Sequence, residues 1–347
     1  MKNEVCIGRV KIGGNNKIAI QSMTNTPTLN YKATLKQINA LSQAGADLVR
    51  IALPCKDSIN VLDYILPNVS LPIIGDFHFD YKLAIAGIEK GLDKIRINPG
   101  NISKSGIKEI VKAAKERNTP IRVGINKGSI KERNPSPKRL AELTMNSCKL
   151  IEDLGYSNLV LAVKSSNVGE TVQAYTELHK LTNHPLHIGL TESGFGAFAQ
   201  IKSSIAIGSL LLNGIGDTIR VSLAGDPIKE IIAAKDILKA TGIDNNFAQI
   251  IACPTCGRCE LDIENLAKAV HNMVCHINKP LKIAVMGCIV NGIGEGKDAD
   301  IGIACGREKS ILFSKGEVLK TVDNTIILSE LNNLLEKYDG CDQKKIY

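Results

Sequence analysis

Residues 93–126 read DKIRINPGNISKSGIKEIVKAAKERNTPIRVGIN and carry the most informative pattern in the chain. Two short apolar runs, residues 93–98 and 120–126, lie on either side of an amphipathic stretch over residues 107–117. Apolar strands that alternate with helices are typical of a parallel sheet that is buried on both faces. The stretch therefore predicts a strand–helix–strand unit of an α/β protein.

The same unit recurs up to about residue 240. The other predicted strands are residues 17–22, 47–52, 72–77, 158–164, 186–191 and 217–222. The other predicted helices include residues 32–44, 138–154, 171–181 and 228–241. Repeated units of roughly thirty residues favour a closed (β/α)₈ TIM barrel over an open doubly wound sheet. No GxGxxG follows the first strand and no GxxxxGK[ST] occurs, so the common nucleotide-binding loops are missing.

Length and composition indicate a globular protein with two domains. The chain has 347 residues, with 44% hydrophobic and 22% charged residues. We expect a barrel domain over residues 1–243 and a smaller α+β domain over residues 244–347. The N-terminus has no apolar signal region, which predicts a cytoplasmic protein, and no apolar run is long enough to span a membrane. The net charge is +8, but Trp is absent and aromatic residues are 4%, so nucleic-acid binding is disfavoured.

Polar or charged residues stand in or just after most of the predicted strands. They are Arg50, Asp76, His78, Arg96, Asn98, Arg122, Asn126, Lys164, Glu192, Arg220 and Ser222. In a barrel, the carboxyl ends of the strands surround one mouth, where active sites form. A single charged strand end is usually solvated or paired, but five basic groups at one mouth repel each other unless an anion neutralises them. Since guanidinium groups suit phosphate oxygens, the pattern predicts a phosphate or diphosphate site.

Glu192 is a carboxylate among these predicted cations. It is well placed to pass a proton to a reacting oxygen. It is equally suited to serve as a counter-ion that organises the arginines, and the sequence leaves both roles open.

The ten cysteines are unevenly distributed. Cys6, Cys55, Cys148 and Cys275 are scattered, and each is best interpreted as a small buried hydrophobe. The remaining six are Cys253, Cys256, Cys259, Cys288, Cys305 and Cys341. Without an export signal, this number of cysteines indicates metal binding or buried thiols rather than a disulfide framework.

Two motifs hold most of the clustered cysteines. A predicted strand enters the CPTC motif of residues 253–256, and a helix is expected from about Asp262. The stretch LKIAVMGCIVNGIGEG, residues 281–296, predicts a strand that enters a glycine-rich loop, with Cys288 at its tip and Glu295 further on. We expect the glycines of this loop to adopt unusual backbone angles around an inorganic centre.

Three centres compete for these residues. Structural zinc would need four ligands, and Cys259 could complete the set. A thioredoxin-like dithiol would use CPTC alone, but the surrounding order is not that of the thioredoxin fold. A 4Fe–4S cluster held by Cys253, Cys256 and Cys288 would leave one iron for an oxygen ligand. The spacing favours iron–sulfur over zinc without excluding zinc, and Cys259 and Cys305 are otherwise packing residues.

Motifs along almost the whole chain closely resemble one family. They are IGGNNKIAIQSMTNT, DLVRIALP, GDFHFD, IRINPGN, RVGINKGS, LAVKSS, HIGLTESG, GIGDTIRVSLAGDP, CPTCGR, VMGCIVNGIGEG and DADIGIACG. This series is similar to that of the bacterial 4-hydroxy-3-methylbut-2-enyl diphosphate synthases of the non-mevalonate isoprenoid pathway. The pairing of CPTCGR with a GC(I/V)VNG(x)GE motif is very specific to that family.

The resemblance implies a set of site residues. A 4Fe–4S cluster would be held by Cys253, Cys256, Cys288 and Glu295. The substrate's diphosphate would be held by Arg50, Arg96, Arg122, Asn126, Lys164, Arg220 and Ser222. Glu192 would lie near the reacting carbons, whereas Asp76 and His78 match a motif without an assigned role.

The resemblance also implies the reaction and the partners. The family reductively opens 2-C-methyl-D-erythritol 2,4-cyclodiphosphate, with electrons from flavodoxin or ferredoxin, and forms head-to-tail homodimers. Two positions depart from its pattern: Ile293 replaces a usual Pro, which questions the rigidity of the loop carrying Glu295, and Cys305 replaces a common Gly with a thiol open to oxidation. From the residues alone, an aldolase with a Schiff-base Lys164 and a zinc tail is the main rival.

Overall fold

The computed structural model describes residues 2–130 and 132–340. The chain divides into two compact units, Met1–Thr241 and Gly242–Tyr347. We call them the barrel unit and the C-terminal unit. Each has its own hydrophobic core, and each is described separately.

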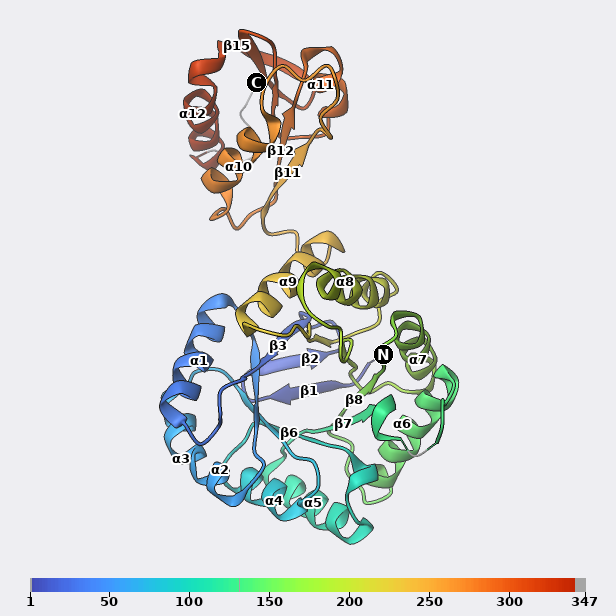
Figure 1. The fold of residues 1–347 in the computed structure, drawn as a ribbon. Helices are drawn as coiled ribbons and strands as arrows, with labels where there is room; N and C mark the ends of the chain where they lie inside the picture. The colour runs from blue at the N-terminus through green and yellow to red at the C-terminus, as the bar shows by residue number, and fades with distance from the viewer. Residues whose placement is uncertain (1, 131, 341–347) are drawn as a thin grey trace. The chain divides into compact units, whose positions relative to one another are not determined.

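Eight parallel strands form the centre of the barrel unit, in the order β8-β7-β6-β5-β4-β3-β10-β9 (Figure 1). They are β3 (Ala19–Met23), β4 (Leu48–Ala52), β5 (Ile73–Asp76), β6 (Lys94–Ile97), β7 (Ile121–Asn126), β8 (Leu159–Lys164), β9 (His187–Ile188) and β10 (Thr218–Ile219). A parallel bridge between Leu161 and Leu186 joins β8 to the segment before β9 and closes the ring. The predicted TIM barrel is confirmed.

Helices surround this ring (Figure 1). They are α1 (Tyr31–Ala44), α2 (Lys56–Asn60), α3 (Leu62–Ile65), α4 (Tyr81–Glu89), α5 (Lys104–Arg117), α6 (Pro137–Glu152), α7 (Val168–Leu181), α8 (Gly196–Leu212) and α9 (Pro227–Ala240), with short 3₁₀ turns at Leu66–Asn68, Pro99–Asn101 and Lys127–Ser129. Local sequence sets the helix ends. The hydroxyl of Ser103 accepts from Gly106 N at the start of α5, and Asn118, with φ of 51°, ends it in the left-handed region.

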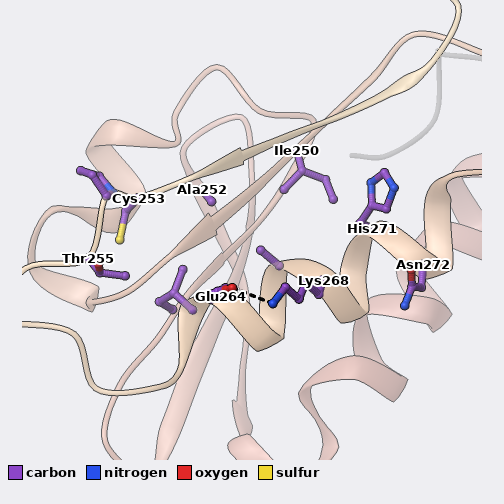
Figure 2. A pocket seen from close by; sticks show the side chains of 11 residues that line it. Ile250, Ala252, Cys253, Thr255, Glu264, Lys268, His271 and Asn272 are labelled. Atoms are coloured by element: carbon purple, nitrogen blue, oxygen red, sulfur yellow. Dashed lines mark hydrogen bonds and ion pairs between the residues drawn. The ribbon is translucent and has the colours of Figure 1, made fainter. Parts of the chain in front are cut away.

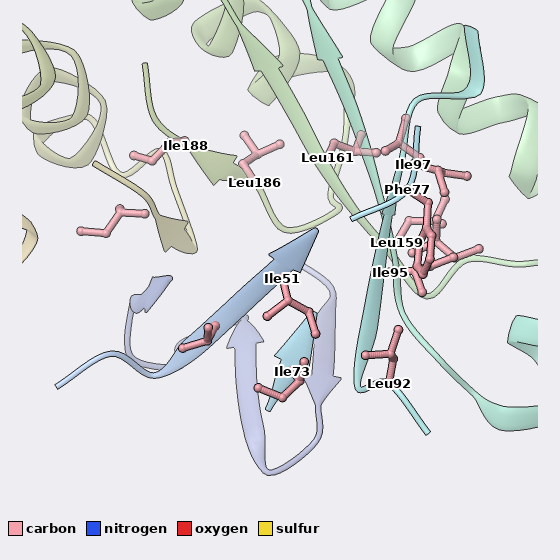
Figure 3. Packing of buried hydrophobic residues seen from close by; sticks show 14 of the residues in the cluster. Ile51, Ile73, Phe77, Leu92, Ile95, Ile97, Leu159, Leu161, Leu186 and Ile188 are labelled. Atoms are coloured by element: carbon pink, nitrogen blue, oxygen red, sulfur yellow. The ribbon is translucent and has the colours of Figure 1, made fainter. Parts of the chain in front are cut away.

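The barrel core lies between strands and helices (Figure 3). Side chains of a strand alternate between its two faces. In β6, Ile95 and Ile97 therefore pack outward in the apolar core, while Lys94 and Arg96 point into the barrel; all four are buried. The alternation explains how a strand with two cations is still buried on both faces.

A hairpin that the sequence analysis did not predict closes the other end of the barrel. It consists of β1 (Glu4–Ile7) and β2 (Val10–Gly13). Val5, Ile7 and Ile12 from the hairpin pack against residues at or near the beginnings of barrel strands, namely Ala19, Leu48, Ile74 and Val160. The hairpin seals the amino ends of the strands, so the opposite mouth is the open end.

The last two barrel strands are shorter than predicted. β9 and β10 have two residues each, and the chain segments that follow them approach each other closely. A Cβ on Gly189 would collide with the carbonyl oxygen of Arg220, and Gly189 has φ of 158°. The ladder ends at this close approach.

The C-terminal unit contains a mixed five-stranded sheet in the order β11-β12-β13-β14-β15. The strands are β11 (Ala248–Ala252), β12 (Leu281–Met286), β13 (Ile301–Ala304), β14 (Lys309–Ser314) and β15 (Glu317–Asp323). The helices are α10 (Ile263–Val274), α11 (Ile289–Glu295) and α12 (Ile327–Gly340), with a 3₁₀ turn at Asn324–Ile326. β11, β12 and β13 are parallel, and the last two strands are antiparallel. In the part of the chain that the structure describes, no helix is long and apolar enough to cross a membrane.

Candidate functional site

Five cationic side chains meet at the open mouth of the barrel, and we call them the cation cluster: Arg50, Arg96, Arg122, Lys164 and Arg220. Strand pairing places Arg96 opposite Arg122, and Asn126 opposite Lys164. Each of the other four cations lowers the pKa of Lys164, which shows that all five lie within electrostatic range of one another. The structure therefore brings together the basic residues that the sequence placed at strand ends.

Asp76, at the end of β5, is the anion at the centre of this group. One of its carboxylate oxygens lies 3.3 Å from Arg96 Nη1, and the other lies 3.9 Å from Arg50 Nε and 3.4 Å from His78 Nε2. Burial alone would raise the pKa of Asp76. The charge of Arg50 and the hydrogen bond from His78 outweigh burial, so this pKa lies well below its ordinary value. Asp76 thus stays ionised and orients the arginines.

The cation cluster has buried donors with no partner among the residues that the structure describes. Arg122 is 3% exposed, and its Nε and Nη1 make no hydrogen bond to the described residues; Arg96 Nε and Arg220 Nε are in the same position. Burial, and then the charges of Arg50 and Arg96, lower the pKa of Arg122. Buried donors without partners are rare, because leaving them unpaired costs free energy. A bound anion would supply acceptors for these buried guanidinium donors.

Sequence reasoning missed several polar groups of the barrel interior. Lys94 is fully buried and its Nζ has no partner among the described residues; burial and then the charge of Arg122 lower its pKa far below the ordinary value. His187 Nε2 lies 3.4 Å from Lys164 Nζ, and His187 Nδ1 lies 2.7 Å from Thr218 Oγ1. A signal for Lys94 existed: the alternation in KIRI places it on the same face as Arg96.

Glu230 of α9 was also missed. It is 4% exposed, accepts a hydrogen bond from Leu223 N at 2.9 Å and lies 3.5 Å from Arg220 Nη2. Burial raises its pKa, although the charge of Arg220 acts in the opposite direction. Nothing in the sequence pattern indicated its burial, because an acidic residue in the first turn of a helix is usually exposed.

Glu192 lies in the loop after β9, at the edge of two hollows. One hollow of about 450 Å³ is lined by Glu192 and Ser222, and another of about 580 Å³ by Glu192 and Asn126. Glu192 has φ of 52°, a conformation that costs free energy for a residue with a side chain. Within the described residues, Glu192 makes no ion pair with the cation cluster, and Asp76 and Glu230 contact the arginines instead.

The clustered cysteines meet in the C-terminal unit. Cys253 follows β11, Cys288 precedes α11 and Glu295 ends α11. A pocket of about 140 Å³, which we call the thiol pocket, is lined by Cys253, Cys256, Cys259, Cys288 and Glu295, together with Arg258 and Asn291. Gly287 N donates to Cys253 Sγ at 3.2 Å. All four predicted ligands therefore line one pocket.

The prediction of a glycine-rich loop after Cys288 is wrong. Residues 289–295 are the helix α11, and Gly287, Gly292, Gly294 and Gly296 all have ordinary backbone angles. Three of these glycines allow close packing instead. A Cβ on Gly292 would lie 2.8 Å from Met286 Cβ, and one on Gly296 would lie 2.7 Å from Phe313. Close helix–sheet packing, rather than backbone freedom, accounts for them.

The structure shows the surroundings of Ile293 and Cys305, the two positions that depart from the family pattern. Ile293 is half-buried within α11 and packs in an apolar cluster, so Glu295 is carried by a helix and not by a loose loop. Cys305 is fully buried, and burial raises its pKa to about 11. The expectation that Cys305 is open to oxidation is wrong, because a buried, protonated thiol is inert.

A groove of about 680 Å³ runs between β11 and α10 and ends at Cys253. Figure 2 shows Cys253 at one end of the groove, and Lys268, His271 and Asn272 along α10. Lys268 is paired with Glu264 at 2.6 Å. Cys253, Pro254 and Thr255 line both the groove and the thiol pocket, so the two hollows adjoin.

A second group in the barrel unit offers metal-ligand atoms. Those of Cys148, Glu152 and His184 lie within 4.8 Å of one another. His184 Nε2 lies 2.9 Å from Glu152 Oε1, and burial raises the pKa of Cys148 to about 12. This geometry is that of a His–Glu pair beside a buried thiol. Cys148 is buried as predicted, whereas the prediction of burial is wrong for Cys6, Cys55 and Cys275, which are exposed.

The donor set of the thiol pocket fits an iron–sulfur cluster. Thiolates are the protein ligands of such clusters, and one carboxylate in the same pocket supplies an oxygen donor. A TIM barrel with a buried cation cluster, joined to a unit with a thiol pocket, defines a class of two-unit metalloenzymes that act on anionic substrates.

Comparison with known proteins identifies the family. The description "GcpE TIM-barrel domain" matches residues 2–235, and "GcpE protein C-terminal domain" matches residues 249–337. The chain belongs to the GcpE family. It is 46% identical over 344 residues to the 4-hydroxy-3-methylbut-2-en-1-yl diphosphate synthase (flavodoxin) of Thermotoga maritima, covering 98% of this chain and 100% of that protein. The enzyme of the same name from Clostridium perfringens is 44% identical over 340 residues, covering 96% and 97%.

Two solved structures of other enzymes have a similar barrel. Yersinia pestis dihydropteroate synthase aligns with a TM-score of 0.53 at 14% identity, covering 70% of this chain and 100% of that one. Type I 3-dehydroquinate dehydratase of Clostridium difficile aligns with a TM-score of 0.53 at 16% identity, covering 70% and 98%. These likenesses show the fold alone.

Proposed function

We propose that the chain carries out its family's reaction with a diphosphate site in the barrel unit and a 4Fe–4S cluster in the C-terminal unit. The chain is an oxidoreductase of isoprenoid biosynthesis that reduces 2-C-methyl-D-erythritol 2,4-cyclodiphosphate to 4-hydroxy-3-methylbut-2-enyl diphosphate. The observation that carries the proposed site is the cation cluster, whose buried donors have no partner among the described residues. A cyclic diphosphate supplies the charge and the acceptors that these donors need.

The diphosphate site consists of the cation cluster with Asn126 and Ser222. Arg122 and Arg96 present guanidinium donors from neighbouring strands, which suits two phosphate groups joined by one bridging oxygen. Asp76 holds Arg96 and Arg50 in place, so it orients the site without contacting the anion. When the ring C–O bond opens, the same cations stabilise the charge that develops on the freed diphosphate.

The cluster ligands are Cys253, Cys256, Cys288 and Glu295. When bound there, a 4Fe–4S cluster would supply electrons one at a time, two per turnover, and an iron that accepts an oxygen ligand. Glu295 is exposed at the end of α11, where it is free to move without disturbing the core.

Glu192 is the proposed proton donor to the hydroxyl that leaves as water. It lies between the hollows that contain Ser222 and Asn126, so it borders the diphosphate site on two sides. Its backbone angle, with φ of 52°, is a costly conformation for a residue with a side chain, which is consistent with a functional role.

A flavodoxin or ferredoxin is the proposed electron donor. The names of the relatives specify flavodoxin. The groove that ends at Cys253 offers such a protein a route to the cluster. The net charge of +8 favours the approach of an acidic donor.

A second copy of the chain is the other proposed partner, in a head-to-tail homodimer. One face of α8 carries the exposed apolar residues Phe198, Ile201, Ile205 and Leu212, of which Phe198 is 72% and Leu212 is 71% exposed. Their spacing places them on one side of the helix, and an exposed apolar stripe of this kind marks an interaction surface. Light scattering of the wild-type protein and of an Ile201→Asp variant tests this: a dimer that dissociates in the variant supports it, and a monomeric wild type contradicts it.

The experiment that tests the function begins with anaerobic purification and reconstitution of the full chain. About four irons and four sulfides per chain, with a thiolate-to-iron absorption band, are expected. Reduced flavodoxin and the cyclic diphosphate should then give the linear product, measured by phosphorus NMR. Zinc in place of iron after reconstitution would refute the redox mechanism.

A further inference from the structure

The thiol pocket contains one sulfur donor more than the proposed ligand set needs. Cys259 lines the pocket together with Cys253, Cys256, Cys288 and Glu295. A cubane cluster has four irons, and each takes one protein ligand. The chain therefore offers five donors for four positions.

The spacing of the cysteines matches a second way of holding a cluster. Residues 253–259 read CPTCGRC, which is C-x₂-C-x₂-C. In bacterial ferredoxins, a C-x₂-C-x₂-C run supplies ligands to one cluster and a distant cysteine completes the set. In this chain Cys288 is the distant cysteine, so four thiols alone form a complete ferredoxin-type ligand set.

Backbone contacts hold Cys259 in the pocket. Cys259 N donates to Cys256 O at 3.0 Å, and Glu260 N donates to Gly287 O at 3.0 Å. Thr255 has φ of 41°, which reverses the chain between the first two cysteines. The Cys259 segment is thereby bound to the same loop that carries Cys288.

Gly287 shows how close two of these sulfurs lie. A Cβ added to Gly287 would collide with Cys259 Sγ and would lie 3.0 Å from Cys253 Sγ. The two sulfurs thus flank the same backbone atom, and Cys253 is a proposed cluster ligand. Cys259 is near enough to that ligand to reach the same cluster.

We propose that Cys259 is an alternative fourth ligand that exchanges with Glu295 on one iron of the cluster. The inference rests on the 4Fe–4S cluster of the proposed function. In the exchange, the bond from iron to the Glu295 oxygen breaks and a bond from iron to Cys259 Sγ forms. The thiol proton passes to the released carboxylate or to water, and no electron is transferred.

The exchange has a functional consequence. With Cys259 bound, all four irons carry thiolates and no iron is open to a substrate oxygen. With Glu295 bound, one iron holds a weaker, harder ligand that a substrate can displace. The all-thiolate form is therefore a closed resting state that protects the cluster from loss of its fourth iron.

Iron content and electron paramagnetic resonance test this without an activity assay. The full chain is reconstituted anaerobically as wild type, Glu295→Ala, Cys259→Ser and the double variant, and then briefly oxidised. We expect Glu295→Ala to keep about four irons because Cys259 takes over, and the double variant to fall to about three with the signal of a three-iron cluster. Glu295→Ala combined with Cys275→Ser is the matched control, because Cys275 is an exposed thiol outside the pocket, and it should keep about four irons.

Each outcome decides the inference. If Glu295→Ala and the double variant have the same iron content, whether both keep the fourth iron or both lose it, Cys259 is not an alternative ligand. If the wild type itself takes up no iron–sulfur cluster, the proposed function fails as well, so the two failures are distinguishable. Loss of the fourth iron in the double variant alone supports the exchange.

Discussion

The cation cluster and the thiol pocket are held by the fold in different ways. Arg96 and Arg122 lie inside neighbouring strands and are 4% and 3% exposed. Cys253, Cys256 and Cys288 instead follow strand ends, and they are half-buried or exposed. The sheet ladder fixes the positions of the cation cluster before any ligand binds. The positions of the cysteines in the thiol pocket are set instead by the turns that follow the strands.

This difference has an energetic origin. The barrel unit has a large apolar core, which offsets the free energy lost by burying five basic side chains beside the two carboxylates Asp76 and Glu230. The C-terminal unit has a much smaller core. In small units a bound metal centre contributes to folding itself. We therefore expect substitutions in the thiol pocket to affect local stability, and substitutions in the cation cluster to affect affinity.

The largest effect is expected for Cys253→Ala combined with Cys259→Ser, because Cys259 lies beside Cys253 and would otherwise supply a fourth donor. Loss of a ligand should remove the cluster and reduce turnover by more than about 100-fold, since changes even beyond the ligands cost 10- to 100-fold at metal sites. Iron analysis and a reductase assay measure this. The binding of the cyclic diphosphate should stay unchanged, because the barrel site is formed independently.

Cys275→Ala is the matched control, since Cys275 is an exposed cysteine of the same unit. It should keep its iron and its activity. If the Cys253→Ala, Cys259→Ser variant retained a full complement of iron, the assignment of the thiol pocket would be wrong.

The next effect is expected for Glu192→Gln. The amide keeps the size of the side chain but has no acidic proton, so turnover should fall by roughly 10²- to 10⁴-fold, the range for general acid catalysis. Substrate affinity should change little, because Glu192 makes no ion pair with the cation cluster in the described residues. Single-turnover kinetics separate the two quantities. Unaltered turnover would leave Glu192 without a role as proton donor.

Arg122→Met tests whether Arg122 contributes to substrate affinity at the expense of the stability of the fold. We expect the dissociation constant of the cyclic diphosphate to rise roughly 10- to 100-fold, as for the loss of a hydrogen bond to a charged group. The thermal midpoint of the free protein should rise at the same time, because a buried cation with unpaired donors is removed. Calorimetry and thermal unfolding give both values.

Arg117→Met serves as the control for Arg122→Met, because Arg117 is exposed at the end of α5. It should change neither quantity. A lower thermal midpoint for Arg122→Met, with unchanged affinity, would show that Arg122 supports the fold rather than the ligand.

Particular residues show what the sequence could predict. The parallel barrel and the basic residues at its mouth followed from period and placement, because Arg96 and Arg122 stand in predicted strands whose carboxyl ends surround one mouth. Gly292 and Gly296 were misinterpreted, because their role depends on how closely α11 packs against Met286 and Phe313. The sequence does not reveal such close approaches between elements.

Two other features were beyond sequence reasoning for similar reasons. The β1–β2 hairpin covers the barrel only because strand beginnings expose apolar residues that need a partner. Glu230 is a buried counter-ion because α9 packs beside Arg220. Both depend on tertiary contacts that local patterns do not encode.

The smallest and most specific effect concerns the pH dependence of substrate binding. Burial, and then the charges of Arg122 and Arg220, lower the pKa of Lys164 well below its ordinary value. Arg50, Arg96 and His187 also face Lys164. A bound diphosphate favours the charged amine, so binding should raise this pKa and take up a proton.

The sign of the effect follows from this shift. Affinity should be fully present below the pKa of Lys164 in the free protein, and should fall as pH rises from that value towards the higher pKa of the complex. Between the two values the loss approaches about tenfold per pH unit. Calorimetry in buffers of different ionisation enthalpy measures both the affinity and the proton uptake.

Lys164→Arg supplies the control, because arginine stays protonated at all accessible pH values. This variant should lose most of the pH dependence while still binding the substrate. An equally steep dependence in Lys164→Arg would assign the proton to another group of the barrel interior, of which Lys94 is the nearest in character because it is also a buried lysine beside Arg122. Lys94→Met should then abolish the pH dependence of substrate affinity. Comparison of the Lys94 and Lys164 variants would show which of the two lysines takes up the proton on binding.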